Sequence, residues 1–103
     1  MSLKTFETYQ LAVEFHRQVR EVRFPAYLKD QVLRASSSIA LNLAEGSGKE
    51  SVKDQRRFYF IALGSFRECE AVLDLCPPAE PSIREFADRL GGCLYRLCRP
   101  RGG

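Results

Sequence analysis

Three breaks divide this chain into four segments, and each segment repeats its apolar residues at helical spacing. Pro25 supplies the first break, Gly46 to Gly48 the second, and Pro77 with Pro78 the third. Proline has no amide hydrogen to donate, and glycine after a periodic run is typical of a helix end. No segment alternates apolar and polar residues at the period of a strand. The pattern therefore predicts helices over about residues 5–22, 26–45, 52–75 and 83–98.

The connections between the predicted helices are short, so consecutive helices are expected to be antiparallel neighbours. The chain has 103 residues, of which 45% are apolar and 28% charged. This length and composition are typical of one compact domain and exclude a two-domain enzyme or a largely disordered chain. We therefore predict an all-α fold in one domain over residues 1–103, an up-down-up-down antiparallel four-helix bundle.

Several helix ends carry their own sequence signals. Ser51 and Ser82 each stand three residues before a carboxylate, the spacing of a capping box, which predicts helix starts there. Gly46 is predicted to end the second helix in the left-handed conformation. Gly91 and Gly92 lie inside the fourth helix and cost about 2 kcal/mol relative to alanine. We expect the last turns of that helix to depend on packing or on a partner.

The predicted apolar surface is larger than one bundle needs. Apolar residues cover more than half the circumference of the first helix, and no residue from Ala35 to Ala44 is charged. Soluble monomers rarely leave apolar surface of that extent in water. The sequence therefore predicts a cyclic homo-oligomer, that is, a ring.

The cysteines and the single histidine do not form a pattern typical of metal binding or covalent catalysis. His16 has no cysteine or carboxylate at an obvious catalytic spacing. The glycines after the second helix lack the lysine and hydroxyl residue of a phosphate-binding loop. We expect no enzymatic activity, metal site, cofactor or disulfide. The cysteines, which contain no CxxC pair, are instead expected in the core: Cys69, Cys76, Cys93 and Cys98.

No apolar run approaches the roughly 20 residues that span a bilayer. The first residues lead into a charged amphipathic stretch and not into an apolar secretion segment. The sequence therefore predicts a cytoplasmic protein without membrane attachment.

Basic residues provide the main functional signal. The net charge is only +3, so a nucleic-acid site requires the basic residues to cluster. Phe60 is interleaved with those of the third helix. One interpretation is a phosphate-binding surface, and the other is a solvated helix face. The predicted nucleic-acid-binding residues lie on the third and fourth helices: Lys53, Arg56, Arg57, Arg67, Arg89, Arg96 and Arg99.

A run of motifs between residues 33 and 70 carries a family resemblance. The segments are RASSSI at 34–39, NLAEG at 42–46, RF at 57–58 and IALGS at 61–65, followed by Glu68. In order and spacing they resemble the four-helix-bundle family of 23S ribosomal RNA intervening-sequence proteins. The resemblance implies a small bacterial protein, often encoded within an insertion in a large-subunit ribosomal RNA gene, with no established enzymatic activity.

The family that this chain resembles is related to the accessory protein of diversity-generating retroelements. That protein is a ring-shaped homopentamer that binds nucleic acid and a reverse transcriptase. The resemblance therefore implies a homopentamer whose partners are ribosomal RNA or another RNA or DNA, and a reverse transcriptase.

Five polar motif residues lie on helices with strongly apolar neighbours. In a structural interpretation they pair with one another across the second and third helices and set the register. In a functional interpretation they contact a ligand. We take the structural interpretation as the prediction for this set: Arg34, Asn42, Glu45, Ser65 and Glu68.

Three functional hypotheses follow from the sequence. The prediction is an oligomeric accessory protein that binds RNA or DNA through basic helix faces. The alternatives are a protein-interaction scaffold without direct nucleic-acid contact and an enzyme that the motifs do not reveal.

Overall fold

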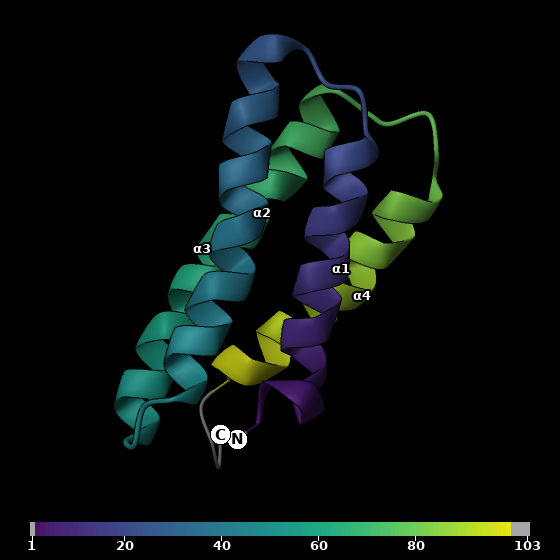
Figure 1. Cartoon of the computed structure of the whole chain (residues 1–103). Coiled ribbons are helices and arrows are strands. Elements are labelled where there is room, and N and C mark those ends of the chain that lie inside the picture. Colours follow the sequence, from purple (N-terminus) through teal and green to yellow (C-terminus); the bar gives the residue numbers. More distant parts are fainter. Residues whose placement is uncertain (1, 100–103) are drawn as a thin grey trace.

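The computed structural model describes residues 2–99. After a 3-10 turn at Leu3–Thr5 come four α-helices, and the described residues contain no strand. Consecutive helices run in opposite directions along the long axis of the molecule (Figure 1). The structure therefore confirms the predicted all-α four-helix bundle. Its helices are α1 (Glu7–Glu21), α2 (Ala26–Ser47), α3 (Val52–Leu75) and α4 (Ser82–Cys98).

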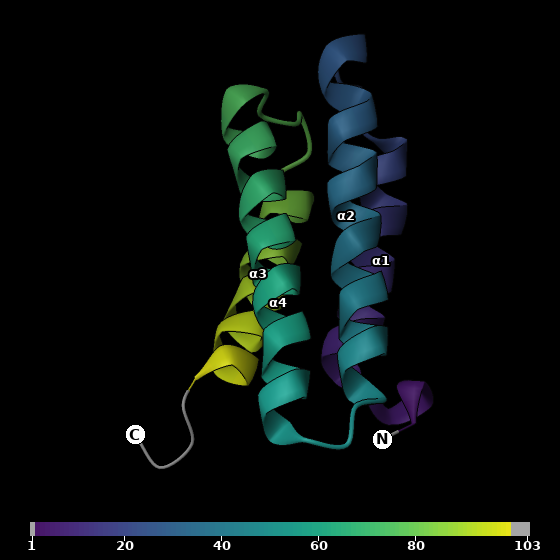
Figure 2. The ribbon, with the colours of Figure 1, turned by 90° about the vertical axis from the view of Figure 1, so that its left-hand side faces the viewer.

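Each helix packs mainly against two neighbours. α1 contacts α2 and α4, and α3 contacts the same two helices. α1 and α3 are therefore diagonal in the bundle, as are α2 and α4. After a turn of 90° about the vertical axis, the bundle shows α3 and α4 as one pair and α1 and α2 as the other (Figure 2). The outer groove between α1 and α2 thus lies on the opposite side from the groove between α3 and α4.

The core forms where the apolar stripes of the four helices meet. Phe15 and Phe66 pack near the middle with their ring centroids 6.3 Å apart. Ile39, Leu43 and the other large aliphatic side chains around them are fully buried. Burying one such side chain contributes about 1.5–3 kcal/mol, so these stripes supply most of the driving force for folding.

The two predicted helix caps behave differently. The Ser51 hydroxyl accepts a hydrogen bond from the Asp54 backbone N–H at 3.1 Å, as its spacing predicts. Ser82 makes no such bond, because Pro81 is the N-cap and Ser82 is already the first helical residue. Pro81 has φ −69° and ψ −19°, a helical conformation. A serine inside the helix no longer has the extended backbone that an N-cap requires, so the cap predicted at Ser82 is wrong.

The glycines at positions 46 and 91 mark close approaches between helices. α2 continues past Gly46, and its C-cap Gly48 has a right-handed φ of −89°, so the left-handed stop predicted at Gly46 is wrong. A Cβ at Gly46 would lie 2.8 Å from Cε1 of Tyr59, and one at Gly91 would lie 2.8 Å from the Phe66 ring. α4 continues through both of its glycines, and the missing side chain of Gly91 leaves room for the Phe66 ring.

Candidate nucleic-acid interface

The first two turns of α3 carry three of the predicted basic residues. From the cap at Ser51, the helical spacing places Lys53, Arg56 and Arg57 on one side of the helix. Lys53 and Arg57 are exposed, and Arg56 is half-buried. Within residues 2–99, none of the three forms an ion pair with a carboxylate. Their positive charges are therefore available to an anion from outside the chain. We call these three residues the α3 cluster.

Aromatic rings lie among these cations. The Arg57 guanidinium carbon is 5.1 Å from the centroid of the Phe58 ring, and the Lys49 ammonium is 5.2 Å from the same centroid. The Arg56 guanidinium carbon is 5.9 Å from the centroid of Phe60, which is 51% exposed. A half-exposed ring beside a guanidinium group is a surface on which a nucleic-acid base can stack.

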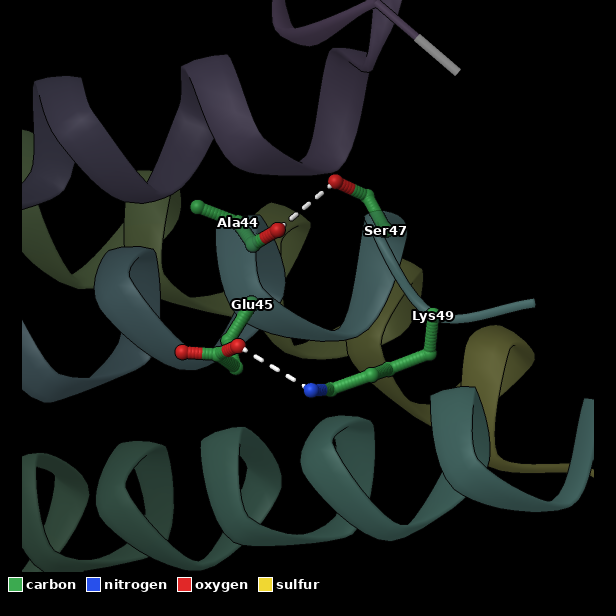
Figure 3. A network of polar contacts seen from close by, with 4 residues as sticks. All are labelled: Ala44, Glu45, Ser47 and Lys49. Atoms are coloured by element: carbon green, nitrogen blue, oxygen red, sulfur yellow. Dashed lines mark hydrogen bonds and ion pairs between the residues drawn. The ribbon is translucent and has the colours of Figure 1, made fainter. Parts of the chain in front are cut away.

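Lys49, in the loop between α2 and α3, is a further cation here that is not among the predicted residues. Its ammonium is 3.3 Å from the Glu45 carboxylate (Figure 3). At the same helix end the Ser47 hydroxyl donates to the Ala44 carbonyl at 2.8 Å. The available signal was the spacing of four residues between Glu45 and Lys49, which brings two side chains together on a helical turn.

Arg56 also faces the last turn of α4. Burial raises the pKa of the Cys98 thiol, and the nearby positive charge of Arg56 opposes that increase. The Nε of Arg56 is buried without a hydrogen-bond partner. Arg99 directly follows Cys98 and is exposed. The helix end that Arg56 faces is therefore followed directly by a further predicted cation, Arg99.

Arg67 lies farther along α3 and already has partners. Its Nη1 donates to the Tyr95 hydroxyl at 2.9 Å, and its Nε is 3.4 Å from the Glu70 carboxylate. Eleven helical residues separate it from Arg56, about 16 Å along the axis. Arg67 thus connects α3 to α4 at a distance from the α3 cluster.

The structure does not bring Arg89 and Arg96 to the α3 cluster. Arg89 is 3.7 Å from the carboxylate of Glu7 on α1. Arg96 donates to the Cys93 sulfur at 3.2 Å and lines a groove together with Glu7. Both arginines therefore lie on the side of α4 that faces α1, close to a negative charge.

Among the polar motif residues, two meet at Ser38. The Ser65 hydroxyl on α3 donates to Ser38 Oγ on α2 at 2.9 Å. The Asn42 amide donates to Ser38 Oγ at 3.0 Å and to the Ser38 carbonyl at 2.9 Å. Ser38 is thus the link between the two helices, a role that the sequence analysis did not assign. We call these three residues the Ser38 network.

The remaining motif residues bond to other partners. The Gln31 amide donates to Glu68 Oε2 at 3.1 Å, Arg34 Nε is 3.5 Å from the Asp30 carbonyl, and Glu45 pairs with the loop lysine described above. Over residues 2–99, none of the five predicted residues bonds directly to another of the five. The expected direct pairing is therefore wrong, because Arg34, Glu45 and Glu68 are exposed and their charged ends face outward.

The buried Cys69 thiol is not a candidate nucleophile, and the described residues contain no metal-binding group of side chains. Burial first, and then the charges of Glu68 and Glu70, raise the pKa of Cys69 to about 12. A thiol with that pKa stays protonated and is a poor nucleophile. Over residues 2–99, no three His, Cys, Asp or Glu side chains are grouped so that they could hold a metal ion.

None of the helices described is long and apolar enough to cross a membrane.

A family model described as 23S rRNA-intervening sequence protein matches residues 4–82. The chain belongs to this family. The match includes all of α1, α2 and α3, and therefore the α3 cluster and the Ser38 network of this family member. It ends at the first residue of α4, so almost all of that helix lies beyond the matched region. A search of curated proteins found no match.

Proposed function

We propose that this 23S rRNA-intervening sequence protein is a non-enzymatic accessory protein that binds the RNA or DNA backbone through the α3 cluster. The observation that carries the proposal is a set of cations without carboxylate partners beside a half-exposed aromatic ring. Lys53, Arg56 and Arg57 are unpaired in the described chain, and Phe60 lies against one of them. The family name, which refers to ribosomal RNA, agrees with a nucleic acid as the partner.

The position of the cluster strengthens its positive potential. The N-terminus of a helix carries a partial positive charge, so cations placed there are disfavoured unless an anion compensates them. Phosphate groups supply that compensation, and each one neutralised releases counterions. Phe60 offers stacking that tolerates any base. Arg99 extends the surface, whereas Arg67, Arg89 and Arg96 contribute only when their partners in the bundle release them.

Self-association is part of the proposal. Large apolar side chains are exposed on the outer sides of α2 and α3, and two of them are Tyr27 at 78% and Leu75 at 74%. Leu41 and Ile61 are exposed on the same helices. Contact between copies would remove these side chains from water. The resemblance described above favours a homopentamer, in which five α3 clusters together bind many phosphates, and a reverse transcriptase as a further partner.

A salt titration of nucleic-acid binding tests the main proposal. Filter binding with a single-stranded RNA and with a DNA of unrelated sequence should give similar affinities that fall steeply as salt rises. Light scattering coupled to size exclusion, run on the same samples, should show a single species larger than the 11.7 kDa chain. Binding that is insensitive to salt would contradict the phosphate contacts.

The second candidate is a protein-interaction scaffold. The exposed apolar side chains of α2 and α3 favour it, because they fit a protein partner as well as another copy. The two candidates differ in one measurement. A scaffold forms its oligomer and shows no salt-dependent binding of RNA or DNA.

A further inference from the structure

The outer groove between α1 and α2 carries a second group of cations, on the other side of the bundle from the groove between α3 and α4. The groove is open, has a volume of about 340 Å³ and is lined by His16, Arg20, Leu33, Arg34 and Ser37. Arginine, histidine and serine side chains are donors, and no carboxylate lines this groove within residues 2–99.

The two arginines have no acidic partners in the described chain. Neither Arg20 nor Arg34 forms an ion pair there. Arg34 also borders the neighbouring groove that contains Glu68, but it forms no ion pair with that carboxylate, which accepts a hydrogen bond from the Gln31 amide. Two guanidinium groups on facing helices repel each other unless an anion lies between them.

His16 is held so that one ring nitrogen is left for the groove. Its Nδ1 is 2.7 Å from Ser36 Oγ, and the Ser36 hydroxyl donates to the Leu33 carbonyl at 3.2 Å. In the imidazolium both ring nitrogens carry a hydrogen, so the Nδ1–H donates to Ser36 Oγ and the Nε2–H is left without a partner among the described residues. A protonated His16 therefore has an Nε2–H to offer to an anion.

The walls of the groove are tied together at the end nearest Arg20. The Lys29 ammonium on α2 donates to the carbonyls of Arg20 at 3.0 Å and of Val22 at 2.7 Å, at the end of α1. These bonds satisfy carbonyls that the helix end would otherwise leave unpaired. They also engage Lys29 itself, so the groove is fixed in place without using the side chains of Arg20 and Arg34.

We propose that this groove binds a phosphate group, held by the guanidinium groups of Arg20 and Arg34 and by Nε2 of His16. Guanidinium groups match the oxygens of phosphate with two parallel hydrogen bonds, and donors on two helices can reach different oxygens of one tetrahedral anion. This site is separate from the α3 cluster, because residues of α1 and α2 form it and its occupancy is measured at His16. It gives the protein a second contact for a phosphorylated ligand on another side.

Nuclear magnetic resonance of the His16 ring tests the site directly, because the chain contains a single histidine. Inorganic phosphate added at constant ionic strength against chloride should shift the His16 resonances in a saturable manner. It should also raise the pKa of His16, which burial and the charge of Arg20 hold below its ordinary value. A bound anion favours the imidazolium and so reverses part of that decrease.

Three single substitutions separate a defined site from general charge attraction. Arg20→Gln and Arg34→Gln should each weaken phosphate binding about tenfold, because each removes charge-assisted hydrogen bonds. Arg17→Gln removes the same charge from the same helix, but its side chain is exposed and lines another groove. It should change the affinity less than about twofold. Circular dichroism of each variant confirms that the bundle is folded.

Two oligonucleotide probes identify the source of the phosphate. A 5′-hydroxyl oligoribonucleotide contains only internal phosphodiesters, and its 5′-phosphorylated form adds a terminal phosphate. A His16 response to both probes supports a backbone contact, and a response to the second alone supports a terminal phosphate.

Equal losses in the three arginine variants, or a linear shift that matches chloride, would overturn the proposed site. The wild-type response should persist in the variant Arg56→Glu with Arg57→Glu. Failure at this groove is thus distinguished from failure of the α3 cluster.

Discussion

The α3 cluster lies on α3 and the Ser38 network joins α3 to α2, and the surroundings of the two groups of polar residues differ. Ser38, Asn42 and Ser65 bond to one another across the contact between α2 and α3. Arg56 and Arg57 have no carboxylate partner in the described chain. Polar groups that bond to other residues of the protein stabilise the fold, whereas polar groups without such partners are available to bind a ligand. The distinction predicts which substitutions affect stability and which affect binding.

The largest expected effect is on binding, from charge reversal in the α3 cluster. Arg56→Glu with Arg57→Glu should weaken RNA binding about 100-fold, because two phosphate contacts become repulsive. The melting temperature should stay near that of the parent, since Arg57 is exposed and the half-buried Arg56 has no ion pair and no hydrogen bond at Nε to lose. Filter binding and thermal unfolding measure the two quantities.

A matched double variant on α4 sharpens this prediction. Arg89→Glu with Arg96→Glu makes the same change in charge on the side that faces α1. Its loss of affinity should be only a few-fold and should vanish at high salt. Equal losses in the two double variants would mean that net charge, and not the α3 cluster, governs binding.

The next effect concerns the contact between α2 and α3, where Gly46→Ala should destabilise the fold by about 1–3 kcal/mol through overpacking. The added methyl group would lie 2.8 Å from Cε1 of Tyr59 and 3.0 Å from Cβ of Phe58. Gly64→Ala is the control, because nothing lies within 4 Å of its Cβ position in α3. It should stabilise the helix by about 0.5–1 kcal/mol. Urea unfolding of both variants checks the opposite signs.

Within the motif, Asn42→Ala should cost about 1 kcal/mol, since it removes the two hydrogen bonds that the half-buried Asn42 amide donates to Ser38. Glu45→Ala and Glu68→Ala should cost less than about 0.5 kcal/mol, because both side chains are exposed. A motif variant that keeps its stability and its oligomer but loses nucleic-acid binding would show that the substituted residue contacts the ligand and does not stabilise the fold.

The smallest effect is a dependence of stability on pH through His16. Burial and the charge of Arg20 lower its pKa in the folded protein, so the unfolded chain binds a proton more readily. Stability should therefore decrease as the pH falls through the ordinary histidine value of 6.5 towards the lower folded value. His16→Gln should show a smaller difference between urea midpoints at pH 7.5 and pH 5.5. An unchanged difference would assign the pH dependence to other groups.

The helices, the Ser51 cap and the α3 cluster could be predicted from the sequence alone, because each depends on residues a few positions apart in the chain. The apolar period and the proline breaks determined four helices, and the Ser51 cap was readable because its partner is three residues away. The α3 cluster was predictable for the same reason, since helical spacing places its members together. The family resemblance was readable from the motifs on α2 and α3, and the family match confirms it.

Only the tertiary structure decided which of these side chains have partners. Arg89 on α4 meets Glu7 on α1, and His16 on α1 meets Ser36 on α2, and in both cases the partner belongs to a different helix. Gly46 had the signature of a helix end, yet its role depends on the ring of Tyr59 on the next helix. Helical periodicity states which residues share a face, but not how far one helix slides or rotates against its neighbour. Those offsets come from packing the whole core, and they determine whether a charge is paired or left for a ligand.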